Sequence, residues 1–373
     1  VFPDDIGEQN SPRFVALQAE EHGYYSGFCP TAKAGDKYAF LLDDDQKPYP
    51  DPMSRFQPEG PHGYSQIVDP TQYRWRDEGR PGFSIKGQVI YEMHIGTFTQ
   101  GGTWATAIEE LPALADLGIT LLEVMPVADF PHKFGWGYDG VNMFAPTRLY
   151  GEPDDMRRFV DAAHALGMGV ILDVVYNHFG PDGNYLAQFS EDYISKQGKT
   201  DWGEAINFDG PNSKHVREFF YTNAAYWIDE FHLDGFRLDA VHAIFDRSDY
   251  HILQEIEDRV RKAAGGRETI MIVENEFQDS KLLKEIKHGG HGIDAAWNDD
   301  FHHAARVAMT GHSDYYYGDY RGTPQELISA VKWGYLYQGQ WNMRQKHPRG
   351  TPGFKLPAYK FVHFLQNHDQ VGN

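Results

Sequence analysis

Seven short apolar runs alternate with helix-like segments over residues 88–373, and this alternation constrains the fold more than any other feature of the sequence. Strand-like runs are predicted at residues 89–95, 120–127, 170–175, 235–240, 269–273, 295–298 and 361–366. Apolar residues at helical spacing predict helices at residues 103–117, 153–166, 213–231 and 250–264. Runs that read as buried on both faces and alternate with helices indicate a parallel sheet with crossover helices. We therefore predict an α/β fold, most often a (β/α)8 TIM barrel, with a doubly wound sheet as the structural alternative.

The residues before this region have a different pattern. Strand-like runs at residues 13–18, 23–28 and 37–42 are separated by turn residues. Three strands alone leave two unpaired edges, so we predict a partial N-terminal β-sandwich at residues 1–66. A Pro- and Gly-rich linker is predicted at residues 67–87.

The predicted barrel occupies residues 88–373, with an excursion at residues 178–212 after its third strand. The seventh predicted strand lies next to the last residue, Asn373. An eight-stranded barrel cannot close without its eighth strand. We therefore expect an incomplete barrel, truncated after strand seven, in a protein that continues beyond this chain.

The net charge narrows the possible binding partners, and the cysteine count indicates the cellular compartment. A formal net charge of −20 argues against nucleic acid or an anionic membrane as partner. The one cysteine in the sequence, Cys29, favours a reducing compartment, so we expect a cytoplasmic protein. The sequence contains no apolar stretch near the roughly 18 residues of a membrane span. Nothing in it indicates an oligomeric state.

Two charged residues interrupt the apolar run at residues 234–240. Arg237 and Asp239 are two positions apart, so on a strand both side chains point to the same side. An unpaired charge inside a core is prohibitively unfavourable, so the two residues need a reason to be there. One interpretation is a buried structural ion pair. The other is an active-site carboxylate that a neighbouring guanidinium keeps ionised.

Polar residues also follow most of the other predicted strands. Active sites of parallel barrels gather at the carboxyl ends of their strands. The residues concerned are Trp136, Tyr138, Asp139, His178, Asp239, His242, Glu274, His368 and Asp369. Taken singly, His178 could satisfy a loop carbonyl, Glu274 could cap the next helix and Asp369 could be a turn residue. Acids or histidines at four strand ends of one rim instead favour a shared site.

The two carboxyl groups at the fourth and fifth strand ends match the needs of glycoside cleavage with retention. That reaction uses one carboxylate as nucleophile and one carboxylic acid as proton donor, about 5–5.5 Å apart. Arg237 beside Asp239 would keep a nucleophile ionised, and a carboxylate-rich site would raise the pKa of Glu274. Glu276 has the same strand parity as Glu274, so either glutamate could face inward.

The remaining polar residues suit a sugar ring that develops positive charge. Asp369 could bind sugar hydroxyls, while His178 and His368 could donate hydrogen bonds that strengthen in the transition state. Tyr138 offers a flat face to the ring.

Metal binding is the main rival interpretation of this cluster. The sequence has no His-x-x-x-His or Cys pair at ligand spacing on one helix, which disfavours a catalytic zinc. A calcium held near Asn177 by loop carbonyls and carboxylates stays open. We expect no cofactor and assign no metal ligands.

These motifs resemble the α-amylase superfamily, glycoside hydrolase family 13, across residues 88–373. The family's signature regions are similar to residues 173–178, 235–242, 272–275 and 364–370. The resemblance implies a (β/α)8 barrel that acts on an α-glucan without a cofactor. It also implies that Asp239 is the nucleophile, Glu274 the acid/base and Asp369 the stabiliser of the transition state. The family places its acid at the strand end, which favours Glu274 over Glu276.

The resemblance also implies binding roles. Arg237, His178 and His368 would line the −1 subsite. Tyr138 would stack there, in a loop that also contributes Trp136 and Asp139 to substrate binding. His242 and Trp202 would contact the leaving-group side. The partial β-sandwich resembles the family's N-terminal starch-binding-like domain.

The same motifs are compatible with two other functions. Glucan branching transferases share the three acids, but they usually carry Gln where Asp139 stands and lack the pair His242 and Ala243. A non-catalytic glucan-binding relative would typically have lost one of the three acids. Asp239, Glu274 and Asp369 are all present, which favours an enzyme.

Overall fold

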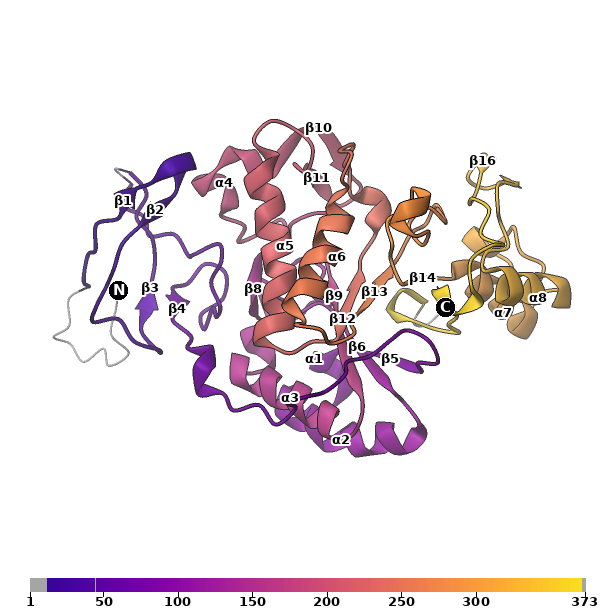
Figure 1. Ribbon diagram of the computed structural model, residues 1–373, viewed down its shortest axis with the longest axis horizontal. Helices are drawn as coiled ribbons and strands as arrows, with labels where there is room; N and C mark the ends of the chain where they lie inside the picture. Colours follow the sequence, from indigo (N-terminus) through magenta and orange to yellow (C-terminus); the bar gives the residue numbers. More distant parts are fainter. Residues whose placement is uncertain (1–11, 44, 371–373) are drawn as a thin grey trace.

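A curled sheet of seven parallel strands forms the centre of the protein (Figure 1). The computed structural model describes residues 12–43 and 45–370. The order across the sheet is β17-β14-β13-β12-β9-β6-β5, and every pairing is parallel. The bounds are β5 Ile90–Met93, β6 Leu121–Val124, β9 Gly169–Val174, β12 Gly235–Leu238, β13 Ile270–Val273, β14 Ala295–Trp297 and β17 Phe361–Val362. All seven strands lie within the predicted runs or start one residue before them, which confirms the predicted α/β class.

The strand order separates the two predicted architectures. A doubly wound sheet reverses its strand order at one point. Here the strands follow one another across the sheet in chain order, without a reversal. The arrangement is a curled part of a barrel and is not a doubly wound sheet.

Four amphipathic helices cover the outward face of the sheet (Figure 1). They are α2 Trp104–Leu117, α3 Pro153–Ala165, α5 Ser213–Glu230 and α6 Ile252–Ala263. Thr103 caps α2 with its side chain, and Gly118 ends that helix in a left-handed conformation (φ 95°) that suits glycine. The fully buried Trp104 and Trp227 pack in the layer between helices and strands, where each large side chain contributes about 1.5–3 kcal/mol.

The concave face of the sheet has two layers. Leu121, Ile171 and Ile270 belong to a small apolar cluster at the amino ends of their strands. Two residues further along, strands β6 and β9 place Glu123 and Asp173, which share the parity of the apolar cluster. The curled sheet therefore has an apolar floor and a charged layer toward its carboxyl ends.

The segment after β17 reaches the opposite edge of the sheet at the carboxyl ends. His368 follows β17, and Glu92 lies on β5, at the opposite edge of the sheet order. Nδ1 of His368 lies 2.7 Å from Oε1 of Glu92. The sheet is thus curled enough to bring residues from both of its edges to one opening at the carboxyl ends of the strands, which we call the mouth.

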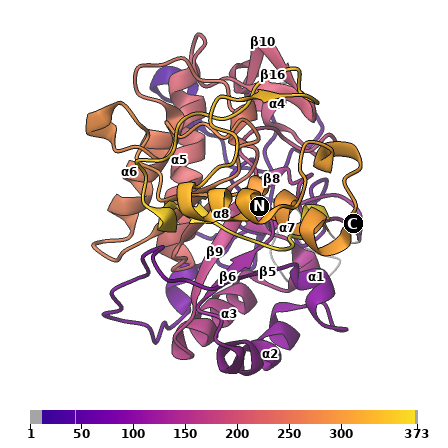
Figure 2. The same ribbon diagram turned by 90° about the vertical axis from the view of Figure 1, so that its right-hand side faces the viewer.

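Several elements were not predicted from the sequence. Helices α7 Asp299–Thr310 and α8 Pro324–Trp333 lie at the end of the molecule opposite the N-terminal strands, and in Figure 2 they lie in front of the central strands. The short helices are α1 Ile95–Phe98 and α4 Leu186–Phe189. Three antiparallel pairs join β7 Ala128–Asp129 to β8 Asn142–Pro146, β10 Ile194–Thr200 to β11 Gly203–Ile206, and β15 Trp341–Asn342 to β16 His347–Pro348.

The N-terminal residues form two separate antiparallel pairs. Strand β1 Gln18–Ala19 pairs with β2 Tyr25–Ser26, and β3 Lys37–Tyr38 pairs with β4 Ser65–Gln66. These strands are shorter than the predicted runs, and the predicted sandwich stays a prediction. Residues 1–11 of that predicted domain, and residues 371–373 at the end of the predicted barrel, lie outside the described residues. Among the helices of the described part, none is long and apolar enough to cross a membrane.

Candidate active site

Arg237 is the centre of the charged layer on the concave face. Strand β12 places it there with no exposed surface. Its Nη1 donates to both carboxylate oxygens of Asp173 (2.9 and 2.8 Å) and to Oδ1 of Asp239 (2.8 Å). Its Nη2 donates to Oε2 of Glu274 (2.8 Å), and the guanidinium lies over the Trp297 ring, 4.1 Å from its centroid. One buried cation therefore organises carboxyl groups from three neighbouring strands.

Asp239 lies one residue after β12, at the mouth. Its Oδ2 accepts a hydrogen bond from the Asn177 side chain at 2.8 Å, and its side chain is 14% exposed. The next residue, Ala240, has a left-handed backbone (φ 39°), which is unfavourable for a residue with a Cβ. That turn directs the Ala240 amide at Oε2 of Glu274, 3.0 Å away. The strained turn thus joins the two strand ends.

Glu274 combines burial with a fixed orientation. Its Oε2 accepts both the Arg237 and the Ala240 hydrogen bonds, which leaves Oε1 to carry a proton. Burial raises the pKa of Glu274 to about 8, with Arg237 opposing the rise and Asp239 adding to it. Glu274 is therefore a carboxylic acid at neutral pH, next to a carboxylate that an arginine holds.

Glu276 lies elsewhere, although it shares strand parity with Glu274. Its side chain is 56% exposed and accepts a hydrogen bond from Gln345 (3.0 Å). Nε2 of His242 lies 3.9 Å from its Oε2. Of the two glutamates, Glu274 is the one that contacts Arg237.

Tyr138 connects this centre to the loop after β17. Its hydroxyl donates to Oδ2 of Asp173 (2.6 Å), and its ring stacks on His368 with centroids 4.9 Å apart. Burial raises the pKa of Asp173 to about 6, and Arg237 opposes the rise. Asp369 follows His368, with Oδ1 3.5 Å from the His368 Nε2 and a side chain that is 54% exposed. The third acid therefore lies at the more open side of the same mouth.

The other predicted binding residues form the rim. His178 stacks on Trp202 (6.0 Å), and the edge of His242 meets Trp202 at 6.2 Å. Burial lowers the pKa of both histidines, so the neutral form of each is favoured. Trp136 is half exposed and meets the His368 ring edge-on at 5.7 Å. Asp139 is exposed at the rim, where its charge acts on His178.

Four acids in or next to the charged layer were not among the predicted site residues. Asp173 and Glu92 carry direct hydrogen bonds to Arg237 and His368, respectively. Glu123 lies in the same layer, and burial raises its pKa well above the usual range. Asp299 is the first residue of α7, after the capping residue Asn298 that follows β14, and burial raises its pKa to about 7. The signal that could have found Glu92, Glu123 and Asp173 is their concave-face parity near strand ends.

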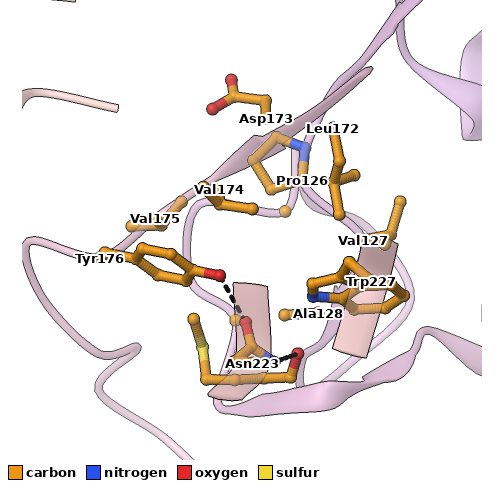
Figure 3. Close-up of a pocket in the computed structure, with 13 residues that line it drawn as sticks. Pro126, Val127, Ala128, Leu172, Asp173, Val174, Val175, Tyr176, Asn223 and Trp227 are labelled. Atoms are coloured by element: carbon orange, nitrogen blue, oxygen red, sulfur yellow. Dashed lines mark hydrogen bonds between the residues drawn. The ribbon is translucent and has the colours of Figure 1, made fainter. Parts of the chain in front are cut away.

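A small cavity lies behind this site and is not part of it. It measures about 20 Å³ and is lined by Pro126, Val174, Tyr176, Asn223 and Trp227, among others. That volume holds about one water molecule. Figure 3 shows that the Asp173 carboxylate points away from the cavity. A sugar ring does not fit there, so the ligand side of the site is the open mouth.

Asn177 offers little to a cation. Its amide nitrogen donates to Asp239, and its oxygen is paired with Nδ1 of His178. Within residues 12–43 and 45–370, the structure shows no group of three or more His, Cys, Asp or Glu side chains arranged to hold a metal ion.

Comparisons with known proteins show what the whole chain is similar to. The model of the α-amylase catalytic domain matches residues 55–205. A crystal structure described as a putative α-amylase from Salmonella typhimurium is 42% identical and superposes with a TM-score of 0.89, over 95% of this chain and 61% of that one. The chain is thus similar to α-amylase catalytic domains over residues 55–205 and to a putative α-amylase over most of its length.

Among the curated relatives, one enzyme recurs. The malto-oligosyltrehalose trehalohydrolase of Saccharolobus solfataricus is 44% identical over 96% of this chain. A 1,4-α-glucan branching enzyme of Pseudoalteromonas atlantica is 31% identical over 76% of it. The chain spans 62% of the length of the first of these relatives and 44% of the second.

Proposed function

We propose that the protein is a retaining glycoside hydrolase that cleaves the α-1,4-glucosidic bond next to the terminal trehalose of malto-oligosyltrehalose and releases trehalose. The observation that carries the chemistry is the shared contact of Arg237 with Asp239 and Glu274, of which Glu274 has its pKa raised to about 8. The substrate rests on 44% identity to a malto-oligosyltrehalose trehalohydrolase. A cytoplasmic location belongs to the same proposal.

The proposed mechanism assigns one role to each acid. Asp239 attacks the anomeric carbon while Glu274 donates its proton to the departing glycosidic oxygen. The covalent glycosyl-enzyme is then hydrolysed by a water molecule from which Glu274, now a base, takes a proton. Asp369 binds sugar hydroxyls of the distorted ring. The contacts of Arg237 with Asp239 and with Glu274 (2.8 Å each) hold the two acids at one guanidinium, which supports this assignment.

The proposed binding residues surround these acids. Arg237, His178, His368 and Tyr138 line the −1 subsite. Trp136 and Asp139 extend the wall beside it. Trp202 and His242, whose rings meet at 6.2 Å, form the leaving-group side.

The proposed domain organisation follows the family. Residues 88–373 belong to a (β/α)8 barrel, with residues 178–212 as an excursion after its third strand. The chain order of the seven parallel strands supports this assignment. Residues 1–66 belong to a starch-binding-like β-sandwich, and residues 67–87 link the two.

The experiment that tests the proposed function compares two substrates. The complete protein is incubated with malto-oligosyltrehalose and, separately, with amylose. Free trehalose from the first substrate is expected. New α-1,6 branches in amylose, without trehalose release from the first substrate, would identify a branching transferase. No change in either substrate would identify a glucan-binding relative.

A further inference from the structure

Glu92 makes a bidentate contact that the sequence analysis did not anticipate. It lies on β5, and its Oε2 accepts the backbone amide of His368 (2.6 Å). Its Oε1 contacts Nδ1 of the same histidine (2.7 Å). Both carboxylate oxygens are thus engaged by one residue that lies 276 positions away in the sequence.

The two contacts fix different properties of His368. The amide contact fixes the main chain at the residue that precedes Asp369. The ring contact fixes the rotation of the imidazole and keeps the hydrogen on Nδ1, because a carboxylate only accepts. Nε2 is then directed toward Oδ1 of Asp369, at 3.5 Å.

The orientation of His368 affects other residues of the mouth through direct contacts. Its ring stacks on Tyr138, whose hydroxyl binds Asp173, and Asp173 is held by Arg237. A connected set of contacts therefore runs from the edge strand β5 to the arginine that holds Asp239. A displaced His368 ring would disturb both Asp369 and Tyr138.

Charged groups from several elements face the His368 ring. Burial lowers its pKa, but the hydrogen bond and charge of Glu92 on β5 more than offset this, with help from Asp369 on its own loop. Arg237 on β12 acts in the opposite direction. The hydroxyl of Tyr138, from the loop after β6, lies 3.4 Å from Nδ1. The net result is a raised pKa that depends on Glu92.

We propose that Glu92 is a positioning residue for the glycosidase reaction, which holds His368, and through it Asp369, where the sugar ring meets them. This inference rests on the proposed function. Glu92 acts through His368, so it is not itself a catalytic residue.

Glu123 provides a matched control on the neighbouring strand. It is the register partner of Glu92, is 2% exposed and shares the concave face. Among the described residues, its Oε1 has no hydrogen-bond partner. Burial and the charge of Glu92 raise its pKa, so it is a neutral carboxylic acid whose shape a glutamine reproduces. Glu123→Gln tests the general effect of altering an acid in this layer.

The experiment measures trehalose release by the complete protein and by the variants Glu92→Gln, Glu123→Gln, His368→Ala and Glu92→Gln/His368→Ala. A glutamine has one accepting oxygen, so its NH2 group faces one of the two His368 donors. A misplacement of about 1 Å costs roughly 100-fold in rate, so we expect Glu92→Gln to lower kcat about 10- to 100-fold. We expect KM to change much less, and Glu123→Gln to keep nearly full activity. In the His368→Ala background, Glu92→Gln should add little further loss, because the two residues act together.

Equal losses for Glu92→Gln and Glu123→Gln, or additive losses in the double variant, would overturn the proposal. A second readout does not need activity. Nitrogen NMR of labelled histidine, assigned with His368→Ala, should show the Nδ1–H form of His368 in the wild type and a lower pKa in Glu92→Gln. An unchanged titration of His368 in Glu92→Gln would also overturn the role of Glu92. A wild type that releases no trehalose would instead refute the proposed function and leave the NMR result to decide on Glu92.

Discussion

At the residue scale, Arg237 neutralises carboxyl groups that would otherwise repel one another. It has no exposed surface and contacts Asp173, Asp239 and Glu274 within 2.9 Å. One cation does not neutralise three anions. Burial raises the pKa of Glu274 to about 8 and that of Asp173 to about 6, so near neutral pH a proton on Glu274 removes one of the negative charges around Arg237. Burial, opposed by Arg237, thus favours a proton on the acid candidate Glu274, which shares the guanidinium with Asp239.

Removing Arg237 should therefore destabilise the fold as well as abolish turnover. In Arg237→Ala the buried Asp173 loses its counter-charge. Breaking a buried ion pair from one side costs about 3–5 kcal/mol. We expect the free energy of unfolding, measured by urea denaturation, to fall by about that amount. A loss below about 1 kcal/mol would contradict the role of Arg237 as the organising cation.

The raised pKa of Glu274 predicts the alkaline limit of activity. A general acid works only while protonated, so kcat/KM should fall as pH rises through about 8, the pKa of Glu274. Glu274→Gln should remove this limb and lower kcat/KM by about 100- to 10,000-fold. Glu276→Gln is the matched control and should behave as the wild type, because its side chain lies away from Arg237. Near-normal turnover by Glu274→Gln would refute the assignment.

Sequence reasoning anticipated part of this mouth and missed another part. Arg237 and Asp239 were found because their parity on one strand is visible locally. Asp173 and Glu92 each look like a lone acid in an apolar run. Their partners, Arg237 and His368, lie 64 and 276 residues away, so the pairing depends on sheet order and curl.

At the element scale, a second buried network ties the residues before the barrel to the base of the sheet. Asp234, with no exposed surface, precedes β12 and accepts the Val170 amide (2.8 Å) and Arg80 (2.9 Å). His164 on α3 bridges Asp234 and Asp77, with each ring nitrogen 2.9 Å from a carboxylate. Helix α3, strand β12 and the segment of residues 67–87 are thereby held together at the amino ends.

This network predicts a pH-dependent stability. Burial lowers the pKa of His164, but the hydrogen bonds to Asp234 and Asp77 outweigh it and leave the pKa raised. A raised folded-state pKa stabilises fully below the unfolded value of about 6.5, and this stabilisation is lost as pH rises through the folded value. His164→Gln should lower the free energy of unfolding by about 1–3 kcal/mol at pH 6. The difference from wild type, followed by thermal or urea unfolding, should shrink as pH rises through the raised folded-state pKa of His164; a constant difference would contradict the charged bridge.

The parallel strands and their helices were largely predictable, and the later elements were not. Apolar runs and helical spacing indicated the sheet strands β5, β6, β9, β12, β13 and β14 and helices α2, α3, α5 and α6 within a few residues. Helix α8 has a capping box at Thr323 and Glu326 that was not used. Strand β17 is two residues long, where six were predicted, because the chain leaves the sheet after Val362. The Leu365 carbonyl there contacts Nδ1 of His302 (2.7 Å) on α7, a contact that no local pattern reveals.

At the scale of the whole molecule, curl creates the site. The acids of the mouth come from β5, β9 and the residues after β12, β13 and β17, which an open flat sheet would spread apart. Because parallel strands place all their carboxyl ends at one edge, curling the sheet brings these side chains around one opening. The contact between Glu92 and His368 (2.7 Å) joins β5, at one edge of the sheet, to the segment that follows β17 at the other edge.

The account depends most on Asp239 as the nucleophile, held by Arg237 beside a protonated Glu274. The direct measurement is to trap the covalent glycosyl-enzyme of the complete protein with a fluorinated glucosyl fluoride and to locate the label by peptide mass spectrometry. We predict a label on Asp239 and none in Asp239→Asn. A label on another residue, or products of inverted anomeric configuration, would contradict it.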